Sequence, residues 1–262
     1  MNIHWMQNND FDSIENLSKE LEEIGYSSVL LTYNSNNPDL FVQAISNLKQ
    51  SSITYNIAVR PHTISPELLA MIAQALESNF PGRFMFNFVS GNFYENENLE
   101  GIIHYDTSLV ANLEYRRNYL SIFLDKFLNR SVLKHKPICM IGSSSEIAIK
   151  LCQKHDLMLA MTYENFMSNK EELLAKVPRL MINLPVILRS EIKDAQGLAD
   201  SFYGQGDFEN KFLVGNSETL LSKITELRGY NINDIMLSNV IEDTKYYKNH
   251  AEIKKALGVL DV

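Results

Sequence analysis

The sequence is poor in cysteine, with only Cys139 and Cys152 among its 262 residues, and this excludes a disulfide-stapled secreted domain. No run approaches the roughly 20 apolar residues that a membrane-spanning helix needs, which argues against a membrane protein. The first residues also lack the basic segment and apolar stretch of a secretory signal. These absences predict a cytoplasmic protein with reduced thiols and no membrane partner.

Clustered positive charge is absent as well. The 24 Lys and Arg residues stand against 32 Asp and Glu residues, which gives a formal net charge of −8. The longest basic group covers only residues 134–136. A surface that binds a phosphate backbone needs clustered Lys and Arg. The sequence therefore predicts no nucleic-acid partner.

Several motifs that would identify a reaction are also missing. The six histidines show no metal-ligand spacing, so no metal site is predicted. There is no G-x-x-x-x-G-K-[ST] loop, and Gly204 and Gly206 lack the third glycine of a dinucleotide fingerprint. The turn at 142–145 is not a G-x-S-x-G nucleophile elbow. The function must be sought in other patterns.

The sequence does contain short apolar runs that alternate with longer helix-period stretches. Expected strands cover residues 2–6, 28–32, 54–59, 83–89, 137–141, 157–162, 180–188 and 234–237. Expected helices cover 12–24, 38–49, 65–79, 110–129, 144–154, 168–177, 191–203, 217–228 and 247–258. Eight strands separated by helices predict an α/β protein with a closed (β/α)₈ TIM barrel. Because no linker or repeat interrupts the pattern, residues 1–262 are expected to form one domain. The ten scattered methionines are interpreted as core filling.

In such a barrel the functional residues follow the carboxyl ends of the strands. Gly142, Ser143, Ser144 and Ser145 join the fifth strand to a helix, and a helix start rich in hydroxyl groups suits a phosphate. The alternative is a helix cap formed by Ser143 or Ser144. Gly91, after the fourth strand, would let the backbone approach a flat ligand, although a simple turn glycine is the alternative.

Basic residues follow the third and fourth strands. Arg60 is placed to hold an anion near the barrel mouth, unless it pairs with a loop carboxylate. Arg116 and Arg117 begin the helix after the fourth strand, where they would meet a phosphate or form a solvated helix face. The long loop at 91–108 contains His104 and several acidic residues, and loops of this length are usually functional.

A family resemblance rests on six segments, at 21–30, 57–66, 80–91, 137–144, 212–219 and 233–238. The most specific are IAVRPHTISP at 57–66 and FPGRFMFNFVSG at 80–91, in which several positions match together. In this order the segments resemble the bacterial luciferase-like family of flavin-dependent monooxygenases. They are most similar to its alkanesulfonate monooxygenase branch.

The resemblance implies a TIM barrel that binds FMN at its mouth. It places Gly142, Ser143, Ser144 and Tyr115 on the flavin phosphate. It places the flavin ring against the ends of the third and fourth strands, at Val59, Arg60, Asn87, Ser90 and Gly91. It also implies reduced FMN supplied by a separate flavin reductase, O₂ as co-substrate, and a dimer formed with itself or with a related chain. F420 in place of FMN stays open.

The substrate side departs from the branch that the chain resembles. An Arg-x-His in its seventh strand is replaced here by Asn183, Leu184 and Pro185. The long insertion before its eighth strand is reduced to about residues 203–211. Arg60, His62 and His104 are the candidates that remain for catalysis on an unidentified small organic molecule. The alternatives are a flavin-binding protein or partner subunit without turnover, and a flavin-free lyase or isomerase that uses carboxylates of the 91–108 loop.

Overall fold

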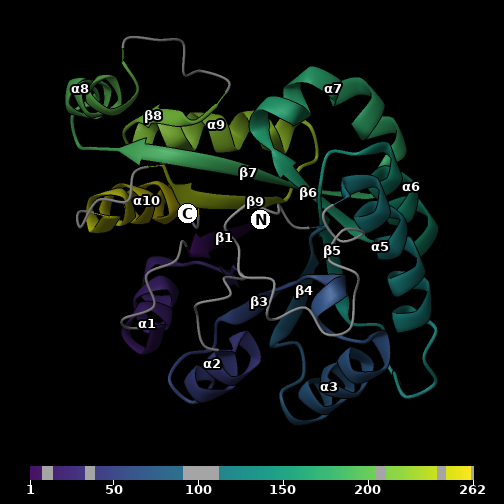
Figure 1. The fold of residues 1–262 in the computed structure, drawn as a ribbon. Helices are drawn as coiled ribbons and strands as arrows, with labels where there is room; N and C mark the ends of the chain where they lie inside the picture. Colours follow the sequence, from purple (N-terminus) through teal and green to yellow (C-terminus); the bar gives the residue numbers. More distant parts are fainter. Residues whose placement is uncertain (8–13, 33–38, 91–111, 205–210, 241–245, 261–262) are drawn as a thin grey trace.

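The protein is a closed parallel β-barrel surrounded by helices (Figure 1). The computed structural model describes residues 1–7, 14–32, 39–90, 112–204, 211–240 and 246–260. The described strands are β1 (Asn2–Gln7), β2 (Ser28–Leu31), β3 (Thr54–Val59), β4 (Phe84–Phe88), β5 (Ile138–Gly142), β6 (Met158–Thr162), β7 (Arg179–Leu188), β8 (Leu213–Gly215) and β9 (Asp234–Asn239). The eight expected strands are all present within a residue or two, and β8 is an addition.

The helices ring the outside of the barrel (Figure 1). They are α1 (Ile14–Ile24), α2 (Leu40–Asn47), α3 (Pro66–Asn79), α5 (Leu113–Leu128), α6 (Glu146–His155), α7 (Tyr163–Lys176), α8 (Ile192–Tyr203), α9 (Ser217–Gly229) and α10 (Tyr246–Leu260), with a 3₁₀ turn η1 (Pro61–Thr63) after β3. Phe86 and Phe88 of β4 pack outward against Phe123 and Phe127 of α5. The main core therefore lies between the barrel and this helical layer.

Strand pairing closes the barrel and confirms the predicted (β/α)₈ fold. Strands β1 to β7 pair in sequence, and β9 fills the space between β7 and β1. Every pairing is parallel. The segment at 234–239 is thus the eighth barrel strand, as the sequence predicts. Since the strands run in the same direction, their carboxyl ends all meet at one rim, which forms the mouth.

Strand β7 is the longest, and Pro185 lies inside it without breaking the sheet. On one edge β7 pairs with β6 through residues 179–183 and with β8 through residues 186–188. Pro185 lies between these two pairings, where a missing N–H disrupts neither ladder. The expected short connection at 203–211 falls partly on 205–210, outside the described residues.

Methionine is the most frequent residue at the inward positions of the barrel strands. Paired residues of adjacent strands point to the same face, so the register identifies the inward positions. Six of these positions hold methionine, namely Met6, Met85, Met140, Met158, Met181 and Met236. The expected role of methionine as core filling is confirmed for these six, which adapt their unbranched side chains to an irregular interior.

Two local predictions were wrong. The predicted helix at 168–177 begins earlier, because Thr162 caps the first turn of α7 by accepting from the N–H of Asn165 at 3.3 Å. Asn169 has a non-helical backbone conformation that divides this helix, so the helical repeat of its second half does not extend to its first half. The cap of α6 is Ser145, rather than Ser143 or Ser144, and its Oγ accepts from the N–H of Ala148.

Candidate functional site

The barrel mouth is built around a contact between strands β4 and β5. The inward position after Met140 on β5 is Gly142, and a Cβ placed there would lie 3.1 Å from Asn87 Oδ1 and 3.0 Å from Val89 Cγ1. A side chain larger than glycine would therefore crowd Asn87 and Val89, which would have to give by a few tenths of an ångström. The Asn87 side chain is buried, and its Oδ1 receives no hydrogen bond within the described residues. A buried acceptor without a donor is unusual in a protein interior, and it marks this point of the mouth for a ligand.

The turn after β5 offers hydroxyl and main-chain donors. Ser143 Oγ accepts from the N–H of Ser145 at 3.1 Å and lies 3.0 Å from Ser145 Oγ. Because Ser145 caps α6 at Ala148, the N–H groups of Glu146 and Ile147 at the helix start have no acceptor in the helix itself. Such N–H groups, at the positive end of a helix dipole, suit an anion. Ser144 lies in the same turn and is exposed.

The start of α5 brings Tyr115 and Arg116 toward the same rim. Asn112 caps the helix by accepting from the N–H groups of Glu114 and Tyr115. The Tyr115 ring is half-buried and stacks on Tyr119, with 6.3 Å between ring centroids and 10° between planes. Arg116 is buried, which contradicts the alternative that this segment is only a solvated helix face.

Arg60 and His62 leave the end of β3 in a tight turn. The Arg60 carbonyl accepts from both the N–H and the hydroxyl of Thr63 at 2.9 Å, and Pro61 fixes the first residue of η1. His62 is buried, and α5 packs against η1. Burial, with the charges of Arg60 and Arg116, lowers the pKa of His62 to about 4. The imidazole is therefore neutral at pH 7 and can accept a proton.

The structure brings several predicted site residues to the same part of the rim. Val59, Arg60, Asn87, Ser90 and Gly142 follow or end the adjacent strands β3, β4 and β5. Ser143, Ser144 and Tyr115 lie at the starts of the two helices that follow β5 and β4. Gly91 and His104 lie outside the described residues.

Sequence reasoning missed the polar groups inside the barrel. Asn56 of β3 is fully buried, donates to Met140 Sδ at 3.3 Å, and has an Oδ1 with no donor in the described part of the chain. At the amino-terminal end, His4 lies 2.6 Å from Ser28 Oγ and 3.2 Å from Asp234 Oδ1. This Ser–His–Asp row is buried on the stabilising side of the barrel, so it is a structural network. Period-two alternation in the strands would have shown which polar residues face inward.

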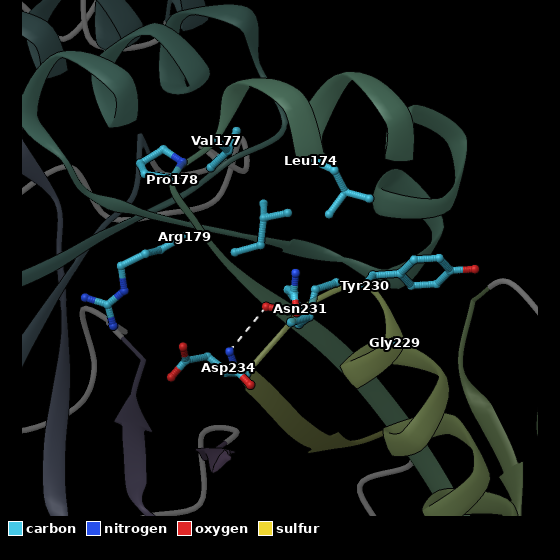
Figure 2. A pocket seen from close by; sticks show the side chains of 11 residues that line it. Leu174, Val177, Pro178, Arg179, Gly229, Tyr230, Asn231 and Asp234 are labelled. Atoms are coloured by element: carbon cyan, nitrogen blue, oxygen red, sulfur yellow. Dashed lines mark hydrogen bonds between the residues drawn. The ribbon is translucent and has the colours of Figure 1, made fainter.

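A cavity of about 460 Å³ lies at the opposite end of the barrel from the mouth (Figure 2). It is lined by residues that precede or begin β7 and β9, among them Arg179, Tyr230 and Asp234. Asn233 Nδ2 donates to the main-chain carbonyl of Asn231 at its edge, at 3.3 Å. The amino-terminal face of a (β/α)₈ barrel serves stability rather than catalysis. We therefore place the candidate site at the mouth.

Both cysteines are buried and free, as expected for reduced thiols. Burial raises the pKa of Cys139 and raises that of Cys152 to about 12, so neither is a reactive thiolate. In the described part of the chain, no three His, Cys, Asp or Glu side chains are grouped so that they could hold a metal ion. No described helix has both the length and the apolar character needed to cross a membrane.

No family model matches the sequence. Solved structures do share its fold. One is the oxygenating constituent of 3,6-diketocamphane monooxygenase from Pseudomonas putida, in complex with FMN. It is 14% identical, with a TM-score of 0.68, over 97% of this chain and 96% of that one.

Two further structures cover almost the whole chain. EDTA monooxygenase from Chelativorans sp. BNC1 is 9% identical, with a TM-score of 0.72, over 100% of this chain and 93% of that one. An F420-dependent secondary alcohol dehydrogenase, in complex with an F420-acetone adduct, is 12% identical, with a TM-score of 0.70, over 99% and 98%. At these identities the likeness shows a common fold.

Proposed function

We propose that the chain is a flavin-dependent oxidoreductase of the luciferase-like family. In this proposal it is a monooxygenase that uses reduced FMN and O₂ on a small organic substrate. The observation that carries the proposal is the Asn87–Gly142 contact, where a buried acceptor that receives no hydrogen bond from the described residues faces the barrel mouth. The resemblance at residues 57–66 and 80–91 supports it, since these segments contain the ends of β3 and β4, which lie at this rim.

The residues at the mouth can bind both the ring and the phosphate of a flavin. The Asn87 Oδ1 can accept a hydrogen bond from an N–H on the edge of the flavin ring. Val59, Ser90 and Gly91 would lie along the same ring. Ser143, Ser144 and the N–H groups at the start of α6 would bind the phosphate, with Gly142 leaving room for the turn and Tyr115 donating from α5.

A bound flavin would supply two-electron transfer and, when reduced, reaction with O₂. The chain's own residues would then bind and orient the substrate. Arg60 would hold an anionic group, and neutral His62 would accept a proton. His104 is a third candidate on the substrate side. A separate flavin reductase would supply the reduced cofactor, and the chain would form a dimer with itself or with a related chain.

One observation favours a second candidate function. The inward positions at the end of β7 are Asn183 and Pro185, and neither carries an ionisable group. Asn183 Oδ1 accepts from the Ser238 hydroxyl at 3.5 Å, so these two polar groups satisfy one another. The same barrel would then serve as a flavin-binding protein without turnover, or as the inactive partner of a heterodimer.

The proposal is tested by anaerobic titration of the full chain with reduced FMN, oxidised FMN, riboflavin and F420. We expect FMN in at least one redox form to bind with a Kd below about 100 μM. Riboflavin should bind at least tenfold more weakly because it lacks the phosphate. If neither form of FMN binds below about 100 μM, a free energy of roughly −5 to −6 kcal/mol, the proposal fails. Product that depends on FMNH₂ and O₂, formed by the isolated chain, would argue against the partner-subunit function.

A further inference from the structure

The barrel interior is accessible from the mouth along one side. The inward positions at the carboxyl ends of β5, β6 and β7 are Gly142, Ala160, Thr162, Asn183 and Pro185. All five are half-buried or exposed, whereas Ala58 and Asn87, the inward residues near the ends of β3 and β4, are buried. The accessible part of the interior therefore lies along β5, β6 and β7.

The side chains along this part of the mouth are small and uncharged. Gly142, Ala160 and Pro185 leave room for the body of a ligand. On the same face, Met181 lies below Asn183 on β7 and Met236 lies beside it on β9, and both are buried. A charged group against these side chains would lose hydration and gain no opposite charge from them. They therefore favour an uncharged group.

Asn183 supplies a hydrogen-bond donor on this side of the mouth. Its Oδ1 accepts from the hydroxyl of Ser238, which is 1% exposed, so the bond turns the other end of the amide away from Ser238. The Nδ2 atom donates to no acceptor in the described parts of the chain. Thr162, the other polar residue here, uses its hydroxyl to cap α7. An amide N–H pairs with a carbonyl or hydroxyl oxygen.

The position of β7 places Asn183 across the mouth from the proposed flavin ring. Three strands separate β7 from β3 in either direction around the barrel. The ring is proposed at the ends of β3 and β4, so a molecule bound beside it would have Asn183 on its other side.

We infer that Asn183 is a specificity-determining residue, whose Nδ2 donates to an uncharged oxygen of the substrate. The substrate is accordingly a carbonyl compound or an alcohol. This inference deepens the proposed function and rests on it, because the flavin across the mouth makes the molecule at Asn183 the substrate. An anionic group held by Arg60 would lie on the β3 side, so the group at Asn183 is a second, uncharged one.

The test compares four small molecules that share a six-carbon ring. Cyclohexanone, cyclohexanol, cyclohexane and cyclohexanecarboxylate are titrated into the full chain without flavin. The side-chain amide signals of Asn183 are followed by NMR and assigned from the Asn183→Leu spectrum. The ketone and the alcohol should shift these signals with a Kd in the millimolar range. The carboxylate should bind at least tenfold more weakly, because it would lie against this side without a counter-charge.

Two variants change the donor in opposite ways, and ligand-observed NMR measures their affinities. Asn183→Leu should bind the ketone at least tenfold more weakly and cyclohexane as before. Asn183→Asp should bind cyclohexylammonium more tightly than cyclohexanone, which reverses the native order. Asn79→Leu is the matched control, because it removes an exposed amide at the end of α3, at the opposite face of the barrel. It should leave every affinity unchanged. If one Asn183 variant fails to fold, the other carries the comparison.

The inference is overturned if the carboxylate binds as tightly as the ketone, if neither the ketone nor the alcohol shifts the Asn183 signals, or if the folded Asn183 variants bind like the native chain. Repeating the titrations with FMN separates substrate from cofactor. Ketone binding should persist with FMN present. If FMN shifts the Asn183 signals and displaces the ketone, Asn183 contacts the flavin and the inference fails. Failure of FMN to bind would sink the proposed function and leave the flavin-free titrations readable.

Discussion

At the scale of single residues, Asn87 gives the sharpest prediction. Asn87→Ala removes an amide whose Oδ1 has no donor in the described structure, so the free energy of unfolding should change by no more than about 1 kcal/mol. Affinity for both FMN and riboflavin should fall about tenfold, because the lost contact is to the ring. Ser143→Ala is the comparison, and it should weaken FMN but not riboflavin. If both variants lose affinity for FMN and for riboflavin to the same extent, Asn87 does not contact the ring and Ser143 does not contact the phosphate as proposed.

Single residues were also where the sequence was least informative. Glycine followed by three serines predicts a helix start, but only the fold shows that Ser145 is the cap and that Gly142 packs closely against Asn87. Likewise, Arg116 beside Arg117 is typical of a solvated face. Its burial follows from the packing of α5 on η1, a contact between segments about 50 residues apart that no local pattern encodes.

At the scale of elements, replacement of glycine by alanine is expected to have opposite effects on stability at two positions, Gly197 and Gly215. Gly197 lies inside α8, and a Cβ there would have no heavy atom within 4 Å. Gly197→Ala should therefore raise the free energy of unfolding by about 0.5–1 kcal/mol, since alanine restricts the unfolded chain and favours helix. At Gly215, which ends β8, a Cβ would lie 2.5 Å from Thr219 Oγ1. Gly215→Ala should therefore lower the free energy of unfolding by about 1–3 kcal/mol.

The residue that an alanine at 215 would clash with, Thr219, is part of the capping box of α9. Its Oγ1 accepts from the N–H of Asn216, while the Asn216 side chain accepts from the N–H of Thr219. Urea unfolding of the two variants, monitored by circular dichroism, makes the comparison. Thr219→Ser removes the Cγ2 contact but keeps the Oγ1 and Cβ contacts, so it should recover little of the Gly215→Ala loss. A stabilised Gly215→Ala protein would show that β8 and α9 do not pack as described.

Elements were mostly predictable because their signals are local. Apolar runs of four to nine residues identified the barrel strands, and helix caps such as Ser65 before Pro66 identified helix starts. Strand β8 was missed because three residues are too short for a period, and it exists only because β7 extends past β6 and leaves an edge to pair. The early start of α7 was missed because its kink at Asn169 interrupts the helical repeat.

At the scale of the whole molecule, barrel closure follows from counting eight strands, but the filling of the barrel does not. The sequence shows ten methionines, and only the register shows that six of them face inward with Asn56 and Asn87. Such an interior has few branched side chains and two amide oxygens without donors in the described chain. The interior therefore has more flexible and more polar side chains than the layers of Val, Ile and Leu that are usual in this fold.

The stability of the whole protein should depend on pH through two buried histidines. Burial, with the Arg60 and Arg116 charges, lowers the pKa of His62 to about 4, and burial lowers that of His250, which lies edge-on to Trp5 and 3.4 Å from Glu20 Oε1. In the unfolded chain both titrate near 6.5. Above that pH both states are neutral and the histidines contribute nothing. As the pH falls below it, the unfolded state takes up protons that the folded state refuses, so stability falls.

We therefore expect the free energy of unfolding in urea to be level from pH 8 to 7 and to decline from pH 6.5 toward pH 4. His62 alone would account for up to about 3 kcal/mol of that decline. His62→Gln should flatten the slope, whereas His135→Gln, at an exposed position, should leave it unchanged. An equal slope in all three proteins would mean that His62 takes up its proton in the folded state as readily as in the unfolded one, because the neighbouring guanidinium charges are already neutralised.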